Sequence, residues 1–251
     1  MLCLLLLLII SHAFAKCENS WYVNSTIEEQ ATEPVNAFSS LAFCAFGIYG
    51  FVVLSRQSSL YCVVLCLFVI TGISSFMHHI KINDRLFHAM DIISMYLLAT
   101  FSWTFMICES GLRRYKITFV SMCFASVCLC VIILAMFVTN TGDRQIVFQI
   151  VLGLILMTQI VTNYALFKST ENNSFIRYSI FSLIAFIIAG ACWLIDVHSC
   201  LQFIPFHTTW HILIAYALFN SLQTTLISKC EFLKLNKKME TWSICMNITI
   251  V

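Results

Sequence analysis

The sequence predicts an all-α fold: a polytopic membrane protein with a single bundle of seven transmembrane helices. Hydrophobic residues make up 60% of the 251-residue chain and charged residues only 10%, against about 25% in soluble domains. The apolar runs are near the roughly 20 residues that a helix needs to cross a bilayer. Only two prolines and seven glycines occur in the whole chain to interrupt them. The net charge of +2 is too small to suggest a nucleic-acid partner.

The N-terminal residues 1–15 have the character of a secretory signal peptide. A short apolar stretch ends at Ala13-x-Ala15, which is a typical cleavage signal. No positively charged stretch precedes it, so a retained membrane anchor is the alternative. The following residues, 16–35, are polar and acidic, and we expect them to lie outside the membrane in the lumen.

Seven apolar stretches within residues 36–228 form the predicted bundle, and residues 229–251 form a C-terminal tail. Each stretch is about as long as a membrane-spanning helix. We expect the spans at Asn36–Leu54, Leu60–His78, His88–Cys108, Ile117–Thr139, Gln145–Phe167, Tyr178–Asp196 and His207–Ile227.

Lysine and arginine residues indicate which ends of the spans face the cytoplasm. If the N-terminus is lumenal, ten of them fall on the cytoplasmic side and four on the lumenal side. Cytoplasmic loops carry an excess of these residues, so the sequence predicts a lumenal N-terminus and a cytoplasmic C-terminus. The cytoplasmic set is Arg56, Arg113, Arg114, Lys116, Lys168, Arg177, Lys229, Lys234, Lys237 and Lys238, and the lumenal set is Lys16, Lys81, Arg85 and Arg144.

Polar residues that are unusual at membrane depth gather at the lumenal ends of four spans. Span 2 ends at His79, span 3 begins near Asp91, span 6 ends at Asp196, and span 7 begins with His207 and His211. The four-residue spacing of the last two puts both imidazoles on one helix face. Three imidazoles and a carboxylate then converge, and three protein ligands with an open position are typical of catalytic zinc. The alternative is that the span 7 histidines are interfacial residues with local hydrogen bonds.

The neighbouring residues suit metal-assisted hydrolysis. An ion held by neutral imidazoles keeps its charge, lowers the pKa of a bound water and polarises a carbonyl. Asp91 is placed to accept the water proton, and Ser75, one turn before His79, can donate to a developing oxyanion. Alternatively, Ser75 bonds a carbonyl four residues back and Asp91 pairs with Arg85. The His78-His79 doublet also leaves a second register open, with His78 and Ser74 in these roles.

Four stretches of the chain resemble the alkaline ceramidases, which belong to a seven-span superfamily with the Per1-like GPI-remodelling proteins and the adiponectin and progestin receptors. The most specific match is F-H-x-W-W-H-I-L, which resembles Phe206–Leu213, and W-x-x-D-x-x-x-C resembles Trp193–Cys200. The motif G-x-x-S-x-x-F-H resembles Gly72–His79, and A-E-F-x-N-T-x-S-N resembles Thr32–Ser40. The interval from His79 to Asp91 is one residue longer than the family pattern, so the chain is a divergent member.

The resemblance implies a zinc ion held by His79, His207 and His211, with Ser75 and Asp91 as catalytic helpers. The implied reaction is hydrolysis of a linear amide C–N bond, which converts ceramide to a sphingoid base and a free fatty acid. The protein would work in the endoplasmic reticulum or Golgi membrane, with its site toward the lumen. Its partners would be the ceramide substrate and membrane lipids, and no obligate protein partner is implied.

The resemblance also implies a calcium site and a disulfide near the N-terminus. The family segment D-W-C-E-x-N binds calcium together with a later glutamate, and this chain keeps Glu18 and Glu33, with Asn19 displaced. The aspartate and tryptophan of the family segment are absent from this chain. Because calcium takes six to eight oxygen ligands, the missing aspartate argues against full calcium dependence. Cys17 and Cys200 match family cysteines on the lumenal side, where disulfides persist, and they are implied to be bridged. Two free thiols are the alternative.

Two other functions remain open at this point. A signal peptide and the Glu33-Pro34 pair are features of the Per1-like branch, which favours a hydrolase of GPI or another acyl ester. A non-enzymatic seven-span lipid receptor that keeps zinc for structure is the second rival. Metal content does not separate these functions, but turnover does.

Overall fold

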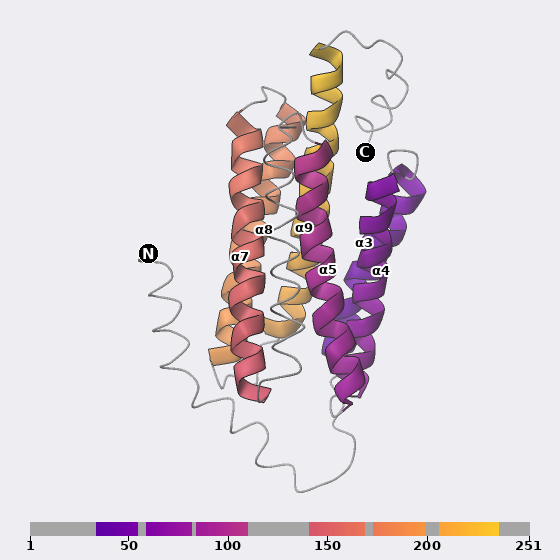
Figure 1. Cartoon of the computed structure of the whole chain (residues 1–251), viewed down its shortest axis with the longest axis vertical. Coiled ribbons are helices and arrows are strands. Elements are labelled where there is room, and N and C mark those ends of the chain that lie inside the picture. The colour runs from indigo at the N-terminus through magenta and orange to yellow at the C-terminus, as the bar shows by residue number, and fades with distance from the viewer. Residues whose placement is uncertain are drawn as a thin grey trace, which may run out of the picture.

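The computed structural model describes residues 34–54, 59–81, 84–109, 141–168, 173–198 and 206–235, and these residues are almost entirely helical. The all-α prediction is therefore confirmed for the described part of the chain. Its helices run roughly side by side along one axis (Figure 1). They are α3 (Pro34–Leu54), α4 (Ser59–Ile80), α5 (Arg85–Glu109), α7 (Thr141–Lys168), α8 (Asn173–His198) and α9 (Phe206–Leu235).

The predicted spans agree with these helices wherever the structure describes them. Of the seven predicted spans, Ile117–Thr139 alone falls wholly outside the described residues. The terminal segments 1–33 and 236–251 also lie outside them. Four of the helices, α3, α4, α5 and α8, are long and apolar enough to cross a membrane. The chain is thus a helical membrane protein, while the number of seven spans and the orientation of the termini stay predictions.

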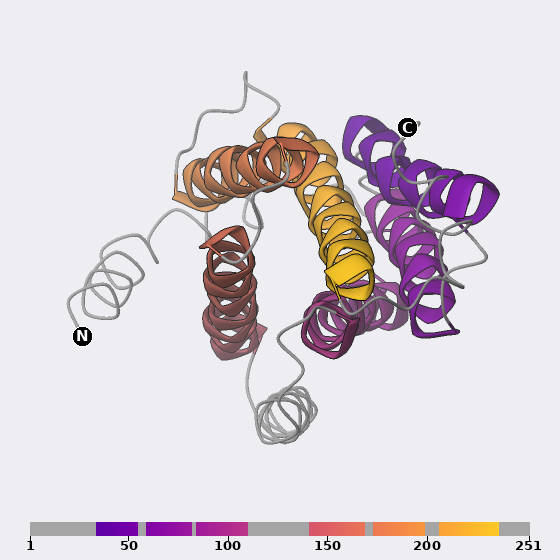
Figure 2. The ribbon, with the colours of Figure 1, turned by 90° about the horizontal axis from the view of Figure 1, so that it is seen from above.

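Helix α9 runs through the middle of the described bundle. It packs between α8 on one side and α3 and α5 on the other (Figure 2). Its inner residues belong to the main hydrophobic core. Leu222 of α9 is part of the same buried cluster as Phe68 of α4 and Phe105 of α5. A helix that is enclosed on several sides can place ligands deep within the protein.

Helix α9 carries several buried polar residues, although it lies in an apolar bundle. Asn220, Ser221 and Thr224 are all buried. Ser221 is 2.7 Å from the Ser182 hydroxyl of α8 and accepts a hydrogen bond from the Asn163 amide of α7. Buried polar groups are costly unless they are hydrogen-bonded, so these contacts tie α9 to its neighbours in one register.

Helices α3 and α4 approach each other closely at Gly72. A Cβ atom at this position would stand 2.5 Å from Cys44 Sγ and 3.1 Å from the Ser40 carbonyl oxygen. The missing side chain therefore lets the two backbones touch. As a result the Ser40 hydroxyl of α3 reaches the Ser75 hydroxyl, one turn further along α4, at 3.0 Å.

Candidate metal centre

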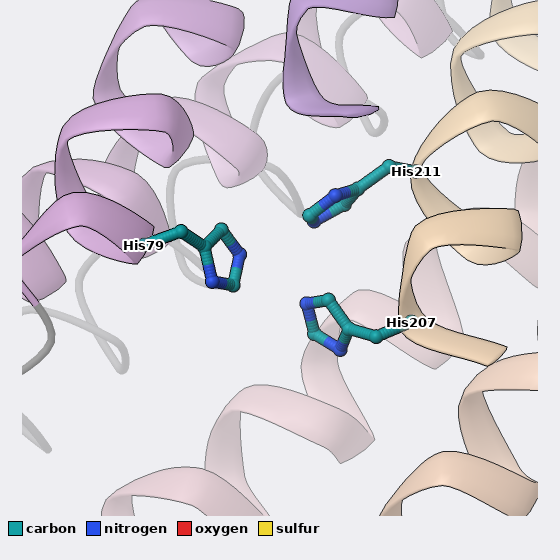
Figure 3. A group of neighbouring side chains, drawn as sticks. All are labelled: His79, His207 and His211. Atoms are coloured by element: carbon teal, nitrogen blue, oxygen red, sulfur yellow. The ribbon is translucent and has the colours of Figure 1, made fainter. Parts of the chain in front are cut away.

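Three histidines from two helices converge at one end of the bundle. His79 comes from the last turn of α4, and His207 and His211 come from the first two turns of α9. One ring nitrogen from each can be chosen so that all three lie within 4.8 Å of one another. The rings surround a common space (Figure 3). The structure therefore contains a group that can hold a metal ion.

The three ligands differ in their exposure. His79 and His211 are buried, with 5% and 1% of their surface exposed, whereas the His207 side chain is 27% exposed. An ion would thus be enclosed on the α4 and inner α9 sides. The more open side lies next to His207.

The donor set fits zinc. Zinc is commonly bound by neutral imidazole nitrogens at about 2.0–2.1 Å, so nitrogens in a tetrahedral site stand about 3.4 Å apart. The three ring nitrogens lie within 4.8 Å of one another, at most about 1.4 Å beyond this spacing. Three protein donors leave a fourth position open, as in catalytic zinc sites.

Hydrogen bonds from α3 assign the tautomer of His211. Its Nδ1 lies 2.9 Å from the Ser39 hydroxyl oxygen and 3.3 Å from that of Ser40. The Ser39 hydroxyl donates to the Asn36 carbonyl oxygen at 2.8 Å. A hydroxyl has one hydrogen, so the Nδ1–H of His211 is the donor to Ser39. Its Nε2 is then the nitrogen available to a metal ion.

An acidic residue from α8 assigns the tautomer of His207 in the same way. The Asp196 carboxylate Oδ2 lies 2.9 Å from His207 Nδ1. A carboxylate accepts hydrogen bonds, so Nδ1 carries the hydrogen and Nε2 is left for a metal ion. The sequence analysis placed Asp196 at the end of the span that precedes the histidines, but it did not predict this contact.

Ser75 and Asp91 lie beside the three histidines. Both are buried, with 1% and 6% exposed, and the Ser75 hydroxyl faces the Asp91 carboxyl group. Asp91 is also close enough to His207 for their charges to interact. Within the described part of the chain, Asp91 Oδ1 is buried without a hydrogen-bond partner. The structure thus brings together the serine, the carboxylate and the imidazoles that the sequence singled out.

The two alternative contacts do not occur among the described residues. Arg85 is exposed while Asp91 is buried, and no ion pair joins them there. Ser75 interacts with Ser40 and Asp91, and the described hydrogen bonds include none from Ser75 to the carbonyl four residues back.

The two histidines of the doublet, His78 and His79, point in different directions from α4. His79 belongs to the convergent group, whereas His78 Nε2 lies 3.4 Å from Nδ1 of His88 at the exposed start of α5. The structure therefore favours the register with His79 and Ser75 over the one with His78 and Ser74.

A small apolar cavity lies next to this centre. It is formed by side chains of α3, α5, α7 and α9, and Trp210 joins it to the ligand group because its ring contacts those of His207 and His211. The other lining residues are Phe43, Met95, Leu98, Ala99, Leu152, Leu156, Ile214 and Leu218.

The predicted calcium and disulfide residues lie outside the described residues. These are Glu18, Asn19, Glu33, Cys17 and Cys200. No disulfide joins the cysteines that the structure does describe. Both predictions therefore stay predictions.

Together, the fold and the centre define a helical membrane protein with a buried three-histidine group that can hold a metal ion. The model of the Ceramidase family matches residues 13–249, which is nearly the whole chain, and the protein belongs to that family. The resemblance found in the sequence motifs is thereby confirmed. No curated protein matches the chain.

Proposed function

We propose that the protein is a zinc-dependent ceramidase, which hydrolyses the amide bond of ceramide to a sphingoid base and a free fatty acid. The observation that carries this proposal is the convergence of three imidazoles, Ser75 and Asp91 at one end of a bundle whose sequence belongs to the ceramidase family. Amide hydrolysis needs an activated water and a stabilised oxyanion, and these residue types can provide both.

His79, His207 and His211 would hold the zinc ion. When bound, zinc supplies Lewis acidity toward a carbonyl oxygen and lowers the pKa of a coordinated water. Three neutral ligands leave the charge of the ion uncompensated, which strengthens both effects. The tautomers of His207 and His211 support this role, because both rings engage the protein through Nδ1 and keep Nε2 available.

Asp91 would accept the proton of the attacking water. Its Oδ1 has no hydrogen-bond partner in the described part of the chain, so it is available to a water in the site. The same carboxyl group can return the proton to the departing amine as the C–N bond breaks. This cycle leaves the protein unchanged at the end of each turnover.

Ser75 would stabilise the carbonyl oxygen as negative charge develops on it. Its hydroxyl lies between Ser40 and Asp91, and its one hydrogen is directed to Asp91. As Asp91 takes up the water proton, this hydrogen would turn from Asp91 to the oxyanion, which requires only rotation of the hydroxyl.

The apolar surface of the bundle supports a lipid substrate. The described residues that line the cavity beside Trp210 are all apolar, but its volume of about 20 Å³ is too small to hold a hydrocarbon chain. Many large apolar side chains on the outside of the bundle, including Phe38, Val52 and Ile187, are exposed, as expected of a surface in contact with lipid.

Further parts of the proposal come from the family resemblance and the sequence. They are residence in the endoplasmic reticulum or Golgi membrane, a lumenal site, cleavage after residue 15 and a Cys17–Cys200 bridge. Full calcium dependence is not proposed, because only Glu18, Asn19 and Glu33 remain of the acidic segment.

The test is hydrolysis of fluorescent ceramides by membranes that carry the wild type, His211→Ala or Asp91→Ala, with zinc content measured on the purified proteins. We expect the wild type to release fatty acid and both variants to be inactive, with metal lost only from His211→Ala. Glu109→Gln is the matched control, because Glu109 pairs with Lys229 at the opposite end of α5. A wild type that holds zinc but cleaves no ceramide of any chain length would exclude the ceramidase and favour an ester hydrolase or a receptor.

A further inference from the structure

A carboxylate from α8 holds the most exposed of the three histidines. The Asp196 Oδ2 to His207 Nδ1 distance is 2.9 Å, and the two side chains are 33% and 27% exposed. His211, in contrast, is 1% exposed and its Nδ1 contacts neutral hydroxyl groups. The two α9 ligands are therefore supported by different chemistry.

The surroundings show why His207 needs such support. His211 is fixed by burial and by two serines of α3. His207 stands in the first turn of α9, where water competes for its ring nitrogens. A charged acceptor makes a stronger hydrogen bond than a neutral one, and so it can hold a partly exposed ring that packing does not.

A pair of tryptophans keeps the carboxylate within reach. Trp193 of α8 and Trp210 of α9 stack with their ring centroids 6.5 Å apart and an interplanar angle of 28°. Each lies three residues from the polar pair, Trp193 before Asp196 and Trp210 after His207. The α8–α9 contact thus has an apolar part inside and a polar part at the rim.

We propose that Asp196 is a positioning residue for the metal centre, which fixes His207 as an Nε2 ligand and strengthens its bond to the ion. This inference rests on the proposed zinc site. A carboxylate that accepts from the far nitrogen of a histidine ligand sets its tautomer and ring orientation and raises its basicity. Asp196 does not enter the reaction itself. Asp91 and Asp196 therefore have separate roles, one toward the substrate and one toward a ligand.

The experiment measures the zinc affinity of the purified full-length protein by competition with a chelator. We expect Asp196→Ala to bind zinc about 10–100-fold more weakly than the wild type, the usual effect of losing such a partner. Asp196→Asn should lose less, because its amide oxygen can still accept from Nδ1. Glu109→Gln removes one carboxylate far from the centre and should bind as the wild type does.

A spectroscopic readout separates positioning from general stability. In the cobalt-substituted protein, the visible absorption bands report the ligand geometry, and we expect them to change in Asp196→Ala and to return toward the wild type in Asp196→Asn. Equal zinc affinity and equal cobalt spectra in the wild type and Asp196→Ala would overturn the inference and leave the zinc site intact. If Asp196→Ala does not fold, Asp196→Asn decides: weaker zinc affinity and altered cobalt spectra at an unchanged thermal midpoint support the inference, and wild-type affinity with wild-type spectra overturns it. A wild type that binds no zinc refutes the proposed function, and the inference with it.

Discussion

Ser39 Oγ lies 2.9 Å from Nδ1 of His211, although 172 residues separate the two in the sequence. The contact joins the first helix of the described chain to its last. Ser39 is held in turn by its hydrogen bond to the Asn36 carbonyl oxygen. The proposed ligand is therefore positioned by a helix that contributes no ligand of its own.

Replacing Ser39 by alanine should weaken zinc binding by about 10-fold, the lower end of the effect of losing a residue that orients a ligand. The Nδ1–H of His211 would lose one acceptor and keep the Ser40 hydroxyl, which is 3.3 Å away, and the Asn36 carbonyl oxygen. Chelator competition measures the change. Thr208→Ala is a useful comparison, because it removes a hydrogen bond to the Asn36 side chain without touching the ring. Equal losses in both variants would attribute the effect to Asn36.

The histidine doublet gives a matched pair of variants. His79→Ala should lower both the zinc affinity and the rate of ceramide hydrolysis by more than about 100-fold. Removing a metal ligand should weaken zinc binding more than removing a residue that only orients a ligand. His78→Ala should retain both, because His78 faces His88 and not the convergent group. Zinc content and ceramide turnover of the two proteins measure this directly. The opposite pattern would show that the register with Ser74 is the active one.

Asp91→Asn should reduce kcat by about 10²–10⁴-fold, the usual range for a general base. Asparagine keeps the size of the side chain and cannot accept the water proton. Zinc content should not change, because Asp91 is not in the three-histidine group. Single-turnover hydrolysis with zinc analysis checks both statements. Loss of zinc in this variant would instead make Asp91 a ligand.

The contact of α3 with α4 makes Gly72 sensitive to any side chain. Gly72→Ala should destabilise the protein by about 1–3 kcal/mol, the usual cost of overpacking, because the new Cβ would meet Cys44 Sγ at 2.5 Å and its backbone nitrogen at 2.9 Å. Thermal unfolding in detergent measures the effect.

Gly190→Ala is the control for this prediction. A Cβ at Gly190 meets nothing within 4 Å, and alanine favours a helix over glycine by about 0.5–1 kcal/mol. We therefore expect a neutral or slightly raised unfolding midpoint. If Gly72→Ala is as stable as Gly190→Ala, the close approach of α3 and α4 is wrong.

Local periodicity made part of the site predictable. The pairing of His207 with His211 follows from their spacing on one helix. The grouping of His79 and Asp91 with them needed only the alternation of spans through the membrane. These inferences depend on the direction in which each span crosses the membrane and on the depth of each residue within it, and not on side-chain packing.

Other parts of the site depend on how each helix is rotated, which the sequence does not give. Adjacent residues differ by about 100° around a helix, so the choice of His79 over His78 follows from the way α4 packs at Gly72. The contact of Asp196 with His207 was missed because it requires two helix ends to face each other. The one available signal was that Asp196 ends the span before the histidines.

The division of the ligands between α4 and α9 has a consequence for biosynthesis. His79 is made early, and its two partners are made only with the last described helix. The serines that orient His211 also precede it in the chain. A growing chain therefore presents one ligand to the membrane and cannot complete the centre until α9 has entered the bundle. The proposed activity would then begin only after α9 has been made and has packed against α3 and α8.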